Sequence, residues 1–195
     1  MHEASHKPIT PDEDLVALAR SDQHFFGMLV ERYESKLDRY LKRITNVSVE
    51  DRQDMLQNIF IKVYSNLNGF DQSLSFSSWI YRIARNEAID WSRRTKTKIK
   101  YGQFDTEDEA LDHVPTYQTF LDELEIKEDR ALVIKAMSDL KPISREVIIL
   151  KYFEDKSYRE ISDILKRPVP TIATLIRRAK DELKGIILTT NHHDK

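Results

Sequence analysis

Apolar residues recur at helical spacing over most of the chain. One stripe runs from Phe25 to Ile44, a second from Leu56 to Leu67 and a third from Trp79 to Ile89. Spacings of three and four residues bring such side chains onto one face of an α-helix. We therefore expect helices over about 12–20, 21–44, 48–67 and 75–96, and helices with such faces pack into a compact bundle.

Residues that favour helix starts precede these stripes. Thr10 and Glu13 form a capping-box pattern, and Pro11 between them suits the first helical position. The expected caps of the next three helices are Ser21 or Asp22, Ser48 and Ser75.

Two short helical patterns joined by a tight turn close the chain. Ser157 and Glu160 form a capping box for the first, and the second is basic. This pattern is typical of a helix-turn-helix, whose second helix enters the DNA major groove. Helices over about 129–140 and from Pro142 precede it, and the chain after Gly185 is expected to fray.

These patterns predict an all-α fold of two small helical domains. We expect an N-terminal helical bundle over 10–97, an acidic flexible linker over 98–128 and a C-terminal helix-turn-helix domain over 129–187. The linker is expected because helical periodicity disappears there and acidic residues dominate. Only 4 Gly and 6 Pro in 195 residues argue against a β-rich fold with many turns.

The net charge of −2 conceals a segregation of charge along the chain. Basic residues cluster within 82–100 and again within 159–184, and acidic residues dominate 105–129 between them. Basic modules on either side of an acidic connector indicate nucleic-acid contacts more strongly than the net charge argues against them.

Composition argues against several other classes of protein. The chain has no Cys, and none of its 6 His residues has metal-ligand spacing, so neither a metal site nor a cofactor is expected. It has no Gly-rich phosphate loop, and its acids gather only in the linker, so an enzyme is not expected. The apolar runs are too short to span a bilayer and no secretory signal is evident, which favours a cytoplasmic protein without membrane insertion.

Three segments resemble conserved parts of bacterial sigma factors. Residues 54–64, DMLQNIFIKVY, look like the second conserved region, and residues 76–90, FSSWIYRIARNEAID, resemble the promoter-melting segment that follows it. The helix-turn-helix resembles the fourth region. In this order, with only an acidic linker between the domains, they are similar to the extracytoplasmic-function group of the sigma-70 family. The resemblance implies a dissociable RNA polymerase subunit that recognises −10 and −35 promoter elements and assists DNA melting.

By this resemblance, the helix over 48–67 docks on core RNA polymerase. Its apolar stripe is expected in the core, which leaves the opposite face for the partner or simply for solvent. An exposed Ile61 or Met55 among polar neighbours would suit the centre of an interface. The candidate polymerase-binding residues are Asp54, Met55, Gln57, Asn58, Ile61 and Lys62.

DNA melting requires unpaired bases to be held outside the stack by apolar or aromatic pockets, hydrogen-bond donors and cations. By resemblance, the loop over 70–75 is the pocket for a flipped −10 base, and the next helix meets the adjacent duplex. The alternative is an ordinary surface turn with Trp79 as a buried anchor. The candidate −10 residues are Phe70, Asp71, Ser73, Phe76, Trp79, Arg82, Arg85, Asn86, Asp90, Arg93 and Arg94.

In the second helix of the helix-turn-helix, Ile172 and Ile176 continue the apolar stripe and are expected in the core. The outward side chains suit DNA, because Arg can bind guanine and Thr or Ala can meet a thymine methyl group. Phosphate contact alone is the alternative for the arginines. The candidate −35 residues are Thr171, Ala173, Thr174, Arg177, Arg178 and Lys180.

The turn of the helix-turn-helix carries Lys166 where the family usually has Gly. A left-handed conformation costs a non-Gly residue roughly 1 kcal/mol, so a reshaped turn is expected here.

Further partners follow from the resemblance alone. The linker, with Glu107, Asp108 and Glu109, is expected to thread through a positively charged polymerase channel, or else to act as a solubilising spacer. An anti-sigma factor is an expected inhibitor. The competing hypothesis is an autonomous helix-turn-helix transcriptional regulator, which would bind paired half-sites as a dimer without polymerase.

Overall fold

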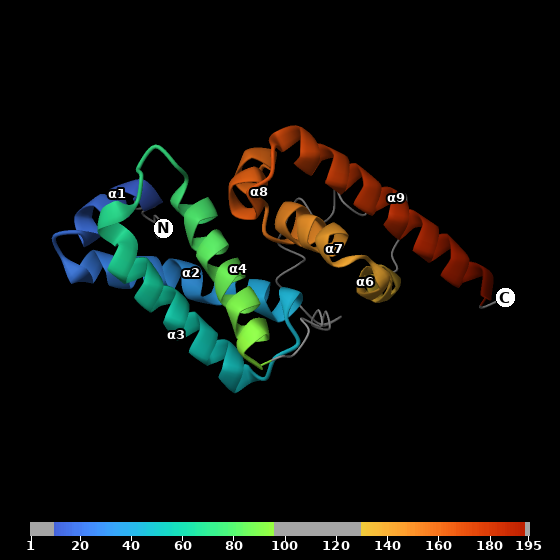
Figure 1. The fold of residues 1–195 in the computed structure, drawn as a ribbon, viewed down its shortest axis with the longest axis horizontal. Helices are drawn as coiled ribbons and strands as arrows, with labels where there is room; N and C mark the ends of the chain where they lie inside the picture. Colours follow the sequence, from blue (N-terminus) through green and yellow to red (C-terminus); the bar gives the residue numbers. More distant parts are fainter. Residues whose placement is uncertain (1–9, 96–129, 194–195) are drawn as a thin grey trace, which may run out of the picture.

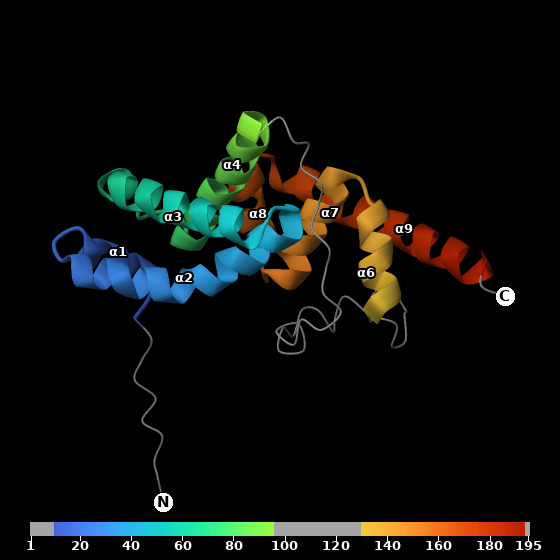
Figure 2. The same ribbon diagram turned by 90° about the horizontal axis from the view of Figure 1, so that it is seen from below.

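The computed structural model describes residues 10–95 and 130–193 of the chain. Within these ranges the regular structure is helical and contains no strand, which confirms the all-α prediction. The helices form two groups, α1 to α4 and α6 to α9, that meet where α4 faces α8 (Figures 1 and 2). The predicted linker over 98–128 lies outside the described residues.

The N-terminal group is the expected bundle. It comprises α1 (Asp12–Ala19), α2 (Gln23–Ile44), α3 (Val49–Asn66), a short 3₁₀ turn (Leu67–Gly69) and α4 (Phe76–Thr95). Leu37 of α2, Ile59 of α3 and Ile80 of α4 are all inaccessible to solvent. Burial of these apolar stripes holds the helices together, because it removes apolar surface from water.

Most predicted helix caps are confirmed. Asp22 accepts a hydrogen bond from the backbone N–H of His24, and Ser48 accepts one from that of Asp51. Ser75 Oγ accepts from the backbone N–H of Ser78 at 3.3 Å, at the start of α4. Each bond satisfies a donor that the helix itself leaves without a partner.

The predicted capping box at Thr10 and Glu13 is wrong. Pro11 is the residue before α1 and makes no side-chain cap. The Glu13 carboxylate instead accepts from the backbone N–H of Phe76, at 3.1 Å and 63 residues along the chain. A side chain of the first helix therefore caps the start of α4, a contact that local sequence cannot reveal.

The C-terminal group comprises α6 (Arg130–Asp139), α7 (Pro142–Ile148), a π-helical segment (Ile149–Phe153), α8 (Tyr158–Leu165) and α9 (Val169–His193). The capping box of Ser157 and Glu160 is present at the start of α8. The prediction that the chain frays after Gly185 is wrong, because α9 continues to His193. Ile187 is buried against the core, and this packing stabilises the additional helical turns.

Candidate nucleic-acid interface

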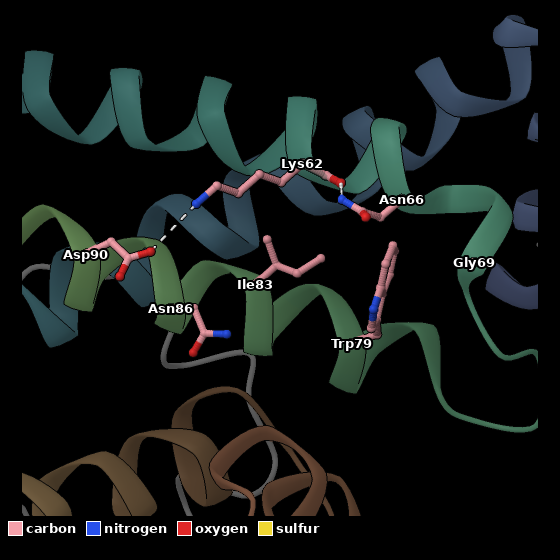
Figure 3. Close-up of a pocket in the computed structure, with 7 residues that line it drawn as sticks. All are labelled: Lys62, Asn66, Gly69, Trp79, Ile83, Asn86 and Asp90. Atoms are coloured by element: carbon pink, nitrogen blue, oxygen red, sulfur yellow. Dashed lines mark hydrogen bonds and ion pairs between the residues drawn. The ribbon is translucent and has the colours of Figure 1, made fainter.

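A pocket of about 520 Å³ lies between the end of α3 and the outer face of α4 (Figure 3). The indole of Trp79 and the side chain of Ile83 rise from α4 toward α3 and form its apolar part. Its polar part is contributed by both helices. The lining residues are Lys62, Asn66, Gly69, Trp79, Ile83, Asn86 and Asp90.

The structure thus brings together residues that sequence reasoning had assigned to different roles. Trp79, Asn86 and Asp90 were expected to face DNA, whereas Lys62 was expected to face polymerase. Lys62 Nζ lies 3.9 Å from Asp90 Oδ2 across the pocket. Ile83 and Asn66 were not predicted as site residues, and Ile83 was indistinguishable from core in the apolar stripe.

A buried carboxylate organises the cations at one end of the pocket. The Glu87 side chain is 1% exposed, yet it accepts from Lys62 Nζ at 2.5 Å and from Arg94 Nη2 at 2.8 Å. Asn58 Nδ2 approaches it at 3.5 Å. Because buried charges require partners, Glu87 fixes the charged ends of Lys62 and Arg94, whose side chains otherwise remain in solvent. Asn58 is consequently drawn toward α4 and is only partly exposed.

Two aromatic residues expected in the DNA pocket are core residues instead. Phe70 and Phe76 are buried, and both pack against Trp79, at ring-centroid distances of 5.0 and 5.7 Å. Phe76 also contacts Tyr33 edge to ring face. Their assignment to direct DNA contact is therefore corrected to a role in the core. An aromatic side chain can fill a protein core as readily as it can stack on a base. They support the pocket by fixing Trp79 from behind.

The tip of the loop lies in solvent. Asp71 and Ser73 are exposed, and the backbone N–H of Ser73 donates to Asp71 Oδ1 at 2.9 Å. Hydrogen bonds from the backbone and then the side chain of Ser73 lower the pKa of Asp71. Arg20 Nη2 donates to the carbonyl of Phe70 at 2.8 Å and ties the loop to α1.

The basic residues along α4 occupy different environments. Arg93 is exposed beside Asp90, Arg94 reaches back to Glu87, and Arg82 is half-buried. Arg85 lies on another face of α4, where its guanidinium binds the carboxylate of Glu146. The predicted −10 set is therefore divided between two faces of one helix.

An apolar surface lies on the outside of α3. Ile61 is 57% exposed and Tyr64 is 48% exposed, and together with Phe26 and Phe60 they line a hollow of about 370 Å³. The exposure of Ile61 is confirmed, whereas Met55 is 1% exposed and therefore a core residue. Tyr64 was placed in the core stripe by its spacing, but it stands at the edge of that stripe and packs on Phe26 at 4.9 Å.

A second hollow adjoins it between α2 and α3. It also measures about 370 Å³, and Asp54 and Gln57 line it together with Glu34. Asp54 and Gln57 are exposed. Gln57 lines both hollows, so these two candidate residues share one surface with Ile61.

The helix-turn-helix forms as predicted, without a reshaped turn. Lys166 adopts the left-handed conformation, with φ of 53° and ψ of 49°, at the end of α8. The backbone N–H of Arg167 donates to the carbonyl of Ser162, and Ser162 Oγ donates back to the carbonyl of Arg167 at 2.6 Å. Hydrogen bonds that fix both sides of the turn offset the cost of a side chain in this conformation.

The second helix of this motif presents a polar face. Ile172 and Ile176 are buried, as expected. Thr171 and Lys180 are half-buried, and the exposed candidates are Ala173, Thr174, Arg177 and Arg178. Arg177 forms an ion pair with Asp181 at 4.0 Å. Both side chains are exposed, so this pairing leaves the guanidinium of Arg177 accessible.

Two negative findings apply to residues 10–95 and 130–193. No helix there has the length and apolar character needed to cross a membrane. No group of three or more His, Asp or Glu side chains gathers in those ranges as metal ligands would.

Family models match both halves of the chain. The model "Sigma-70 region 2" matches residues 29–98, and the model "Sigma-70, region 4" matches residues 130–183. The first match includes the pocket between α3 and α4, and the second includes the helix-turn-helix. An autonomous helix-turn-helix regulator would explain only the second match, so that alternative is not favoured.

Individual relatives match along most of both chains. The chain is 30% identical over 172 residues to the ECF RNA polymerase sigma factor SigW of Bacillus subtilis, covering 85% of this chain and 90% of SigW. It is 30% identical over 172 residues to the ECF RNA polymerase sigma-E factor of Escherichia coli K12, covering 84% and 87% of the two chains.

Solved structures share the fold. CnrH, in complex with the cytosolic domain of CnrY, matches with a TM-score of 0.65 at 24% identity, over 91% of this chain and 97% of CnrH. The sigma factor RpoE of Bartonella quintana, in complex with the anti-sigma factor NepR, matches with a TM-score of 0.59 at 19% identity, over 83% and 96%. The chain therefore belongs to the extracytoplasmic-function group of the sigma-70 family of RNA polymerase sigma factors.

Proposed function

We propose that three surfaces divide the work of this sigma factor. As a member of its family, the chain binds core RNA polymerase and directs promoter-specific initiation of transcription. In our proposal the pocket between α3 and α4 holds an unpaired base of the −10 element. The outer face of α3 docks on polymerase, and the exposed face of α9 recognises the −35 element. Promoter recognition of this kind needs no catalytic residue in the sigma factor itself.

The pocket between α3 and α4 carries the proposal. Holding a flipped base requires an aromatic or apolar wall, a hydrogen-bonding group for the base edge and cations for the flanking phosphates. Trp79 and Ile83 supply the wall and the exposed Asn86 supplies an amide. Lys62 and Arg94, both held by Glu87, supply positive charge at one end. Their common location supports reassigning Lys62 from polymerase binding to DNA binding.

Replacement of Asn86 by Ala tests this assignment. Asn86 is exposed, so the variant should fold normally. We expect open-complex formation to slow by about tenfold or more, in line with the roughly 1–3 kcal/mol of a good base contact. Permanganate reactivity of unpaired thymines measures the opening. Asn46→Ala, exposed between α2 and α3, is the matched control. Unchanged opening by the Asn86 variant would contradict the assignment.

The outer face of α3 has the composition of a protein interface. Exposed Ile61 and Tyr64 form an apolar centre, and the polar Asp54 and Gln57 form part of its rim. An apolar centre with a polar rim is the usual arrangement in protein–protein contacts. We assign this surface to core polymerase.

The exposed residues of α9 suit the major groove. The motif places Ala173, Thr174, Arg177 and Arg178 on one accessible side. Replacement of Arg177 by Ala distinguishes base contact from phosphate contact. Relaxed choice at one promoter position would indicate a base contact, and a uniform loss over all promoters would indicate a phosphate contact.

The domain boundaries and the linker remain part of this proposal. We assign −10 recognition to 10–97, −35 recognition to 129–187 and the connection to 98–128. Replacing Glu107, Asp108 and Glu109 by Gln, Asn and Gln should reduce transcription if the linker enters a positively charged channel. Unchanged transcription would leave it the role of a spacer.

An anti-sigma factor is the expected regulatory partner. Two structural neighbours, CnrH and the Bartonella RpoE, were each solved with a second protein, and NepR is named an anti-sigma factor. Co-purification of a protein that blocks polymerase binding would test this expectation. We expect both partners to meet this chain in the cytoplasm.

A further inference from the structure

Side chains from α1 hold both ends of the loop over 70–75. At the first residue of the loop, Arg20 Nη2 donates to the backbone carbonyl of Phe70 at 2.8 Å. Directly after the loop, the Glu13 carboxylate accepts from the backbone N–H of Phe76 at 3.1 Å. The paired residues are 50 and 63 positions apart in the chain. Two long-range contacts therefore fix the points where the loop leaves the bundle and returns to it.

Between these two points the loop is bonded locally. The backbone N–H of Ser73 donates to Asp71 Oδ1 at 2.9 Å, and that of Leu74 donates to the carbonyl of Asp71 at 3.0 Å. All three residues are exposed. Local bonds preserve the shape of this turn, but they do not determine where it stands relative to the bundle. The position of the turn therefore depends on its two ends.

Helix α1 is a firm anchor because it is itself fixed on α2. Leu15 and Val16 of α1 are inaccessible to solvent. Arg32 and Tyr33 of α2 both donate to the carboxylate of Asp12, at the start of α1. Burial of an apolar face and charge-assisted hydrogen bonds together hold the two helices in one arrangement.

The chemistry of each α1 side chain matches the backbone group that it meets. The start of α4 has N–H groups without partners inside the helix, and a carboxylate there also interacts favourably with the helix dipole. A guanidinium is a donor only, which suits the carbonyl of Phe70. Both contacts are partly buried. Loss of Glu13 or Arg20 would therefore leave a partly buried backbone group without its protein partner.

The two residues held by α1 also support the wall of the pocket between α3 and α4. The rings of Phe70 and Phe76 lie 5.0 and 5.7 Å from the ring of Trp79, measured between centroids. Trp79 lines the pocket, and so does Gly69, which precedes Phe70. Close-packed interiors transmit small displacements, so a shift at either end of the loop should reach Trp79.

We propose that Glu13 and Arg20 are positioning residues for −10 recognition, through which α1 sets the loop over 70–75 and the Trp79 wall for the unpaired base. The proposal rests on the assignment of the −10 pocket above. Both residues act through the backbone of the loop and not by contact with the base. Helix α1 (Asp12–Ala19) precedes residues 29–98, which match the family model, so this contribution comes from outside the matched segment.

Three variants test the proposal in the complex with polymerase. Glu13→Ala removes the acceptor for the N–H of Phe76, whereas Glu13→Gln keeps a side-chain oxygen as acceptor. Asp14→Ala is the matched control, because it removes an exposed carboxylate from the same first turn of α1. We expect Glu13→Ala to slow promoter opening by about tenfold, the effect of one charged hydrogen bond. Glu13→Gln should recover most of the rate, and Asp14→Ala should leave it unchanged. Permanganate reactivity of unpaired thymines measures the opening.

Hydrogen exchange in the free protein separates positioning from folding. Glu13→Ala should accelerate exchange of the amides over 71–76 by about tenfold, and amides of α3 should keep their protection, because only the loop loosens. Arg20→Ala, at the other end of the loop, should have the same two effects. Arg20 is exposed, so this variant provides the test if Glu13→Ala does not fold.

Several results would overturn the positioning role. One is normal opening with both Glu13→Ala and Arg20→Ala, and another is a loss of protection throughout α3, which would indicate general destabilisation. Opening that is equally slow with Glu13→Gln would indicate a role of the charge and not of the hydrogen bond. Asn86→Ala shows which assignment has failed. If Asn86→Ala alone slows opening, only the positioning role falls, whereas normal opening in all three variants would overturn the −10 pocket as well.

Discussion

Helix α4 has two charged faces that differ in their access to water. On the pocket face, the Arg93 side chain is 76% exposed and Lys62 opposite is 45% exposed. At the interdomain contact, where the two groups of helices meet beside α4, Arg43 of α2 and Glu154 of the C-terminal group are each 4% exposed. Both sets of charges are paired within the protein, but only the first remains accessible to a ligand from solvent.

The difference shows that burial, and not residue type, decides what an arginine does. Solvent-exposed pairs contribute little, so Arg93 can exchange Asp90 for a phosphate at small cost. A buried pair binds its partner specifically and is costly to break from one side. Glu87 lies between these cases, because it is buried itself while the cations that it holds remain accessible.

Phe76→Ala should have the largest effect, because it loosens the helix that carries both faces. Phe76 is fully buried beneath Trp79 and against Tyr33. A large-to-small change in such a site costs about 3–5 kcal/mol of unfolding free energy. Urea unfolding measures the loss, with Leu74→Ala, partly exposed in the adjoining loop, as the control. A loss below about 1 kcal/mol would contradict the placement of Phe76 in the core.

Arg43→Met and Arg93→Met compare a buried and an exposed arginine directly. Removing the buried arginine leaves Glu154 without its ion-pair partner, and the interdomain contact should lose about 3 kcal/mol, near the low end for buried pairs. The low end is expected because Tyr81 still donates to Glu154. Removing the exposed arginine should change stability by less than about 0.5 kcal/mol. Hydrogen exchange of α8 amides measures the stability of the interdomain contact. Equal effects of the two variants would contradict the distinction between the buried and the exposed arginine.

Ile61→Glu should weaken binding to core polymerase by about 30-fold, the effect of about 2 kcal/mol at an interface centre. The residue is exposed, so folding should be unaffected. Fluorescence titration of labelled sigma factor with polymerase measures the affinity. Ser35→Glu, exposed on α2 and not among the residues that line either hollow, is the control. Equal affinities would move the docking surface elsewhere.

The smallest expected effect is a pH dependence confined to the interdomain contact. Burial raises the pKa of Glu154 above its ordinary value, so Glu154 holds a proton more tightly within the interdomain contact than it would in water. The corresponding stabilisation is complete below the ordinary carboxyl pKa and is lost as pH rises through the raised value. Acidification from neutral pH should therefore stabilise the interdomain contact. Burial lowers the pKa of Lys156, which also lies at this contact.

Glu154→Gln removes the acidic titration and keeps the shape of the side chain. The protection factors of its α8 amides should stay flat as pH falls from neutral, where those of the background protein should rise. A background protein with the same flat profile would contradict the raised pKa.

Elements controlled by local chemistry were predictable from sequence. Asp22, Ser48 and Ser157 cap their helices because a short polar side chain reaches donors two or three residues away. The left-handed Lys166 was not predicted, since the fixed turn around it outweighs the cost of a side chain there. The role of Glu13 was also hidden, because its partner lies 63 residues away.

Residue type alone did not distinguish site from core in the −10 segment. Phe70, Phe76 and Trp79 offer similar chemistry, and only packing decides that Trp79 reaches the pocket while the other two support it. The interdomain contact was equally hidden, because Glu146 and Glu154 give no sign in the sequence that their partners belong to another domain. The partners of these two carboxylates are determined by tertiary packing, about which sequence periodicity carries no information.

The central claim is that a −10 base enters the pocket between α3 and α4, and photocrosslinking tests it most directly. A 5-iodouracil replaces each thymine of the −10 strand in turn, and the open complex with polymerase is irradiated. The account predicts that one position crosslinks to the α4 peptide containing Trp79, Ile83 and Asn86, and that this crosslink is weakened by Asn86→Ala. Crosslinks that reach only α9 or polymerase, from every position, would contradict it.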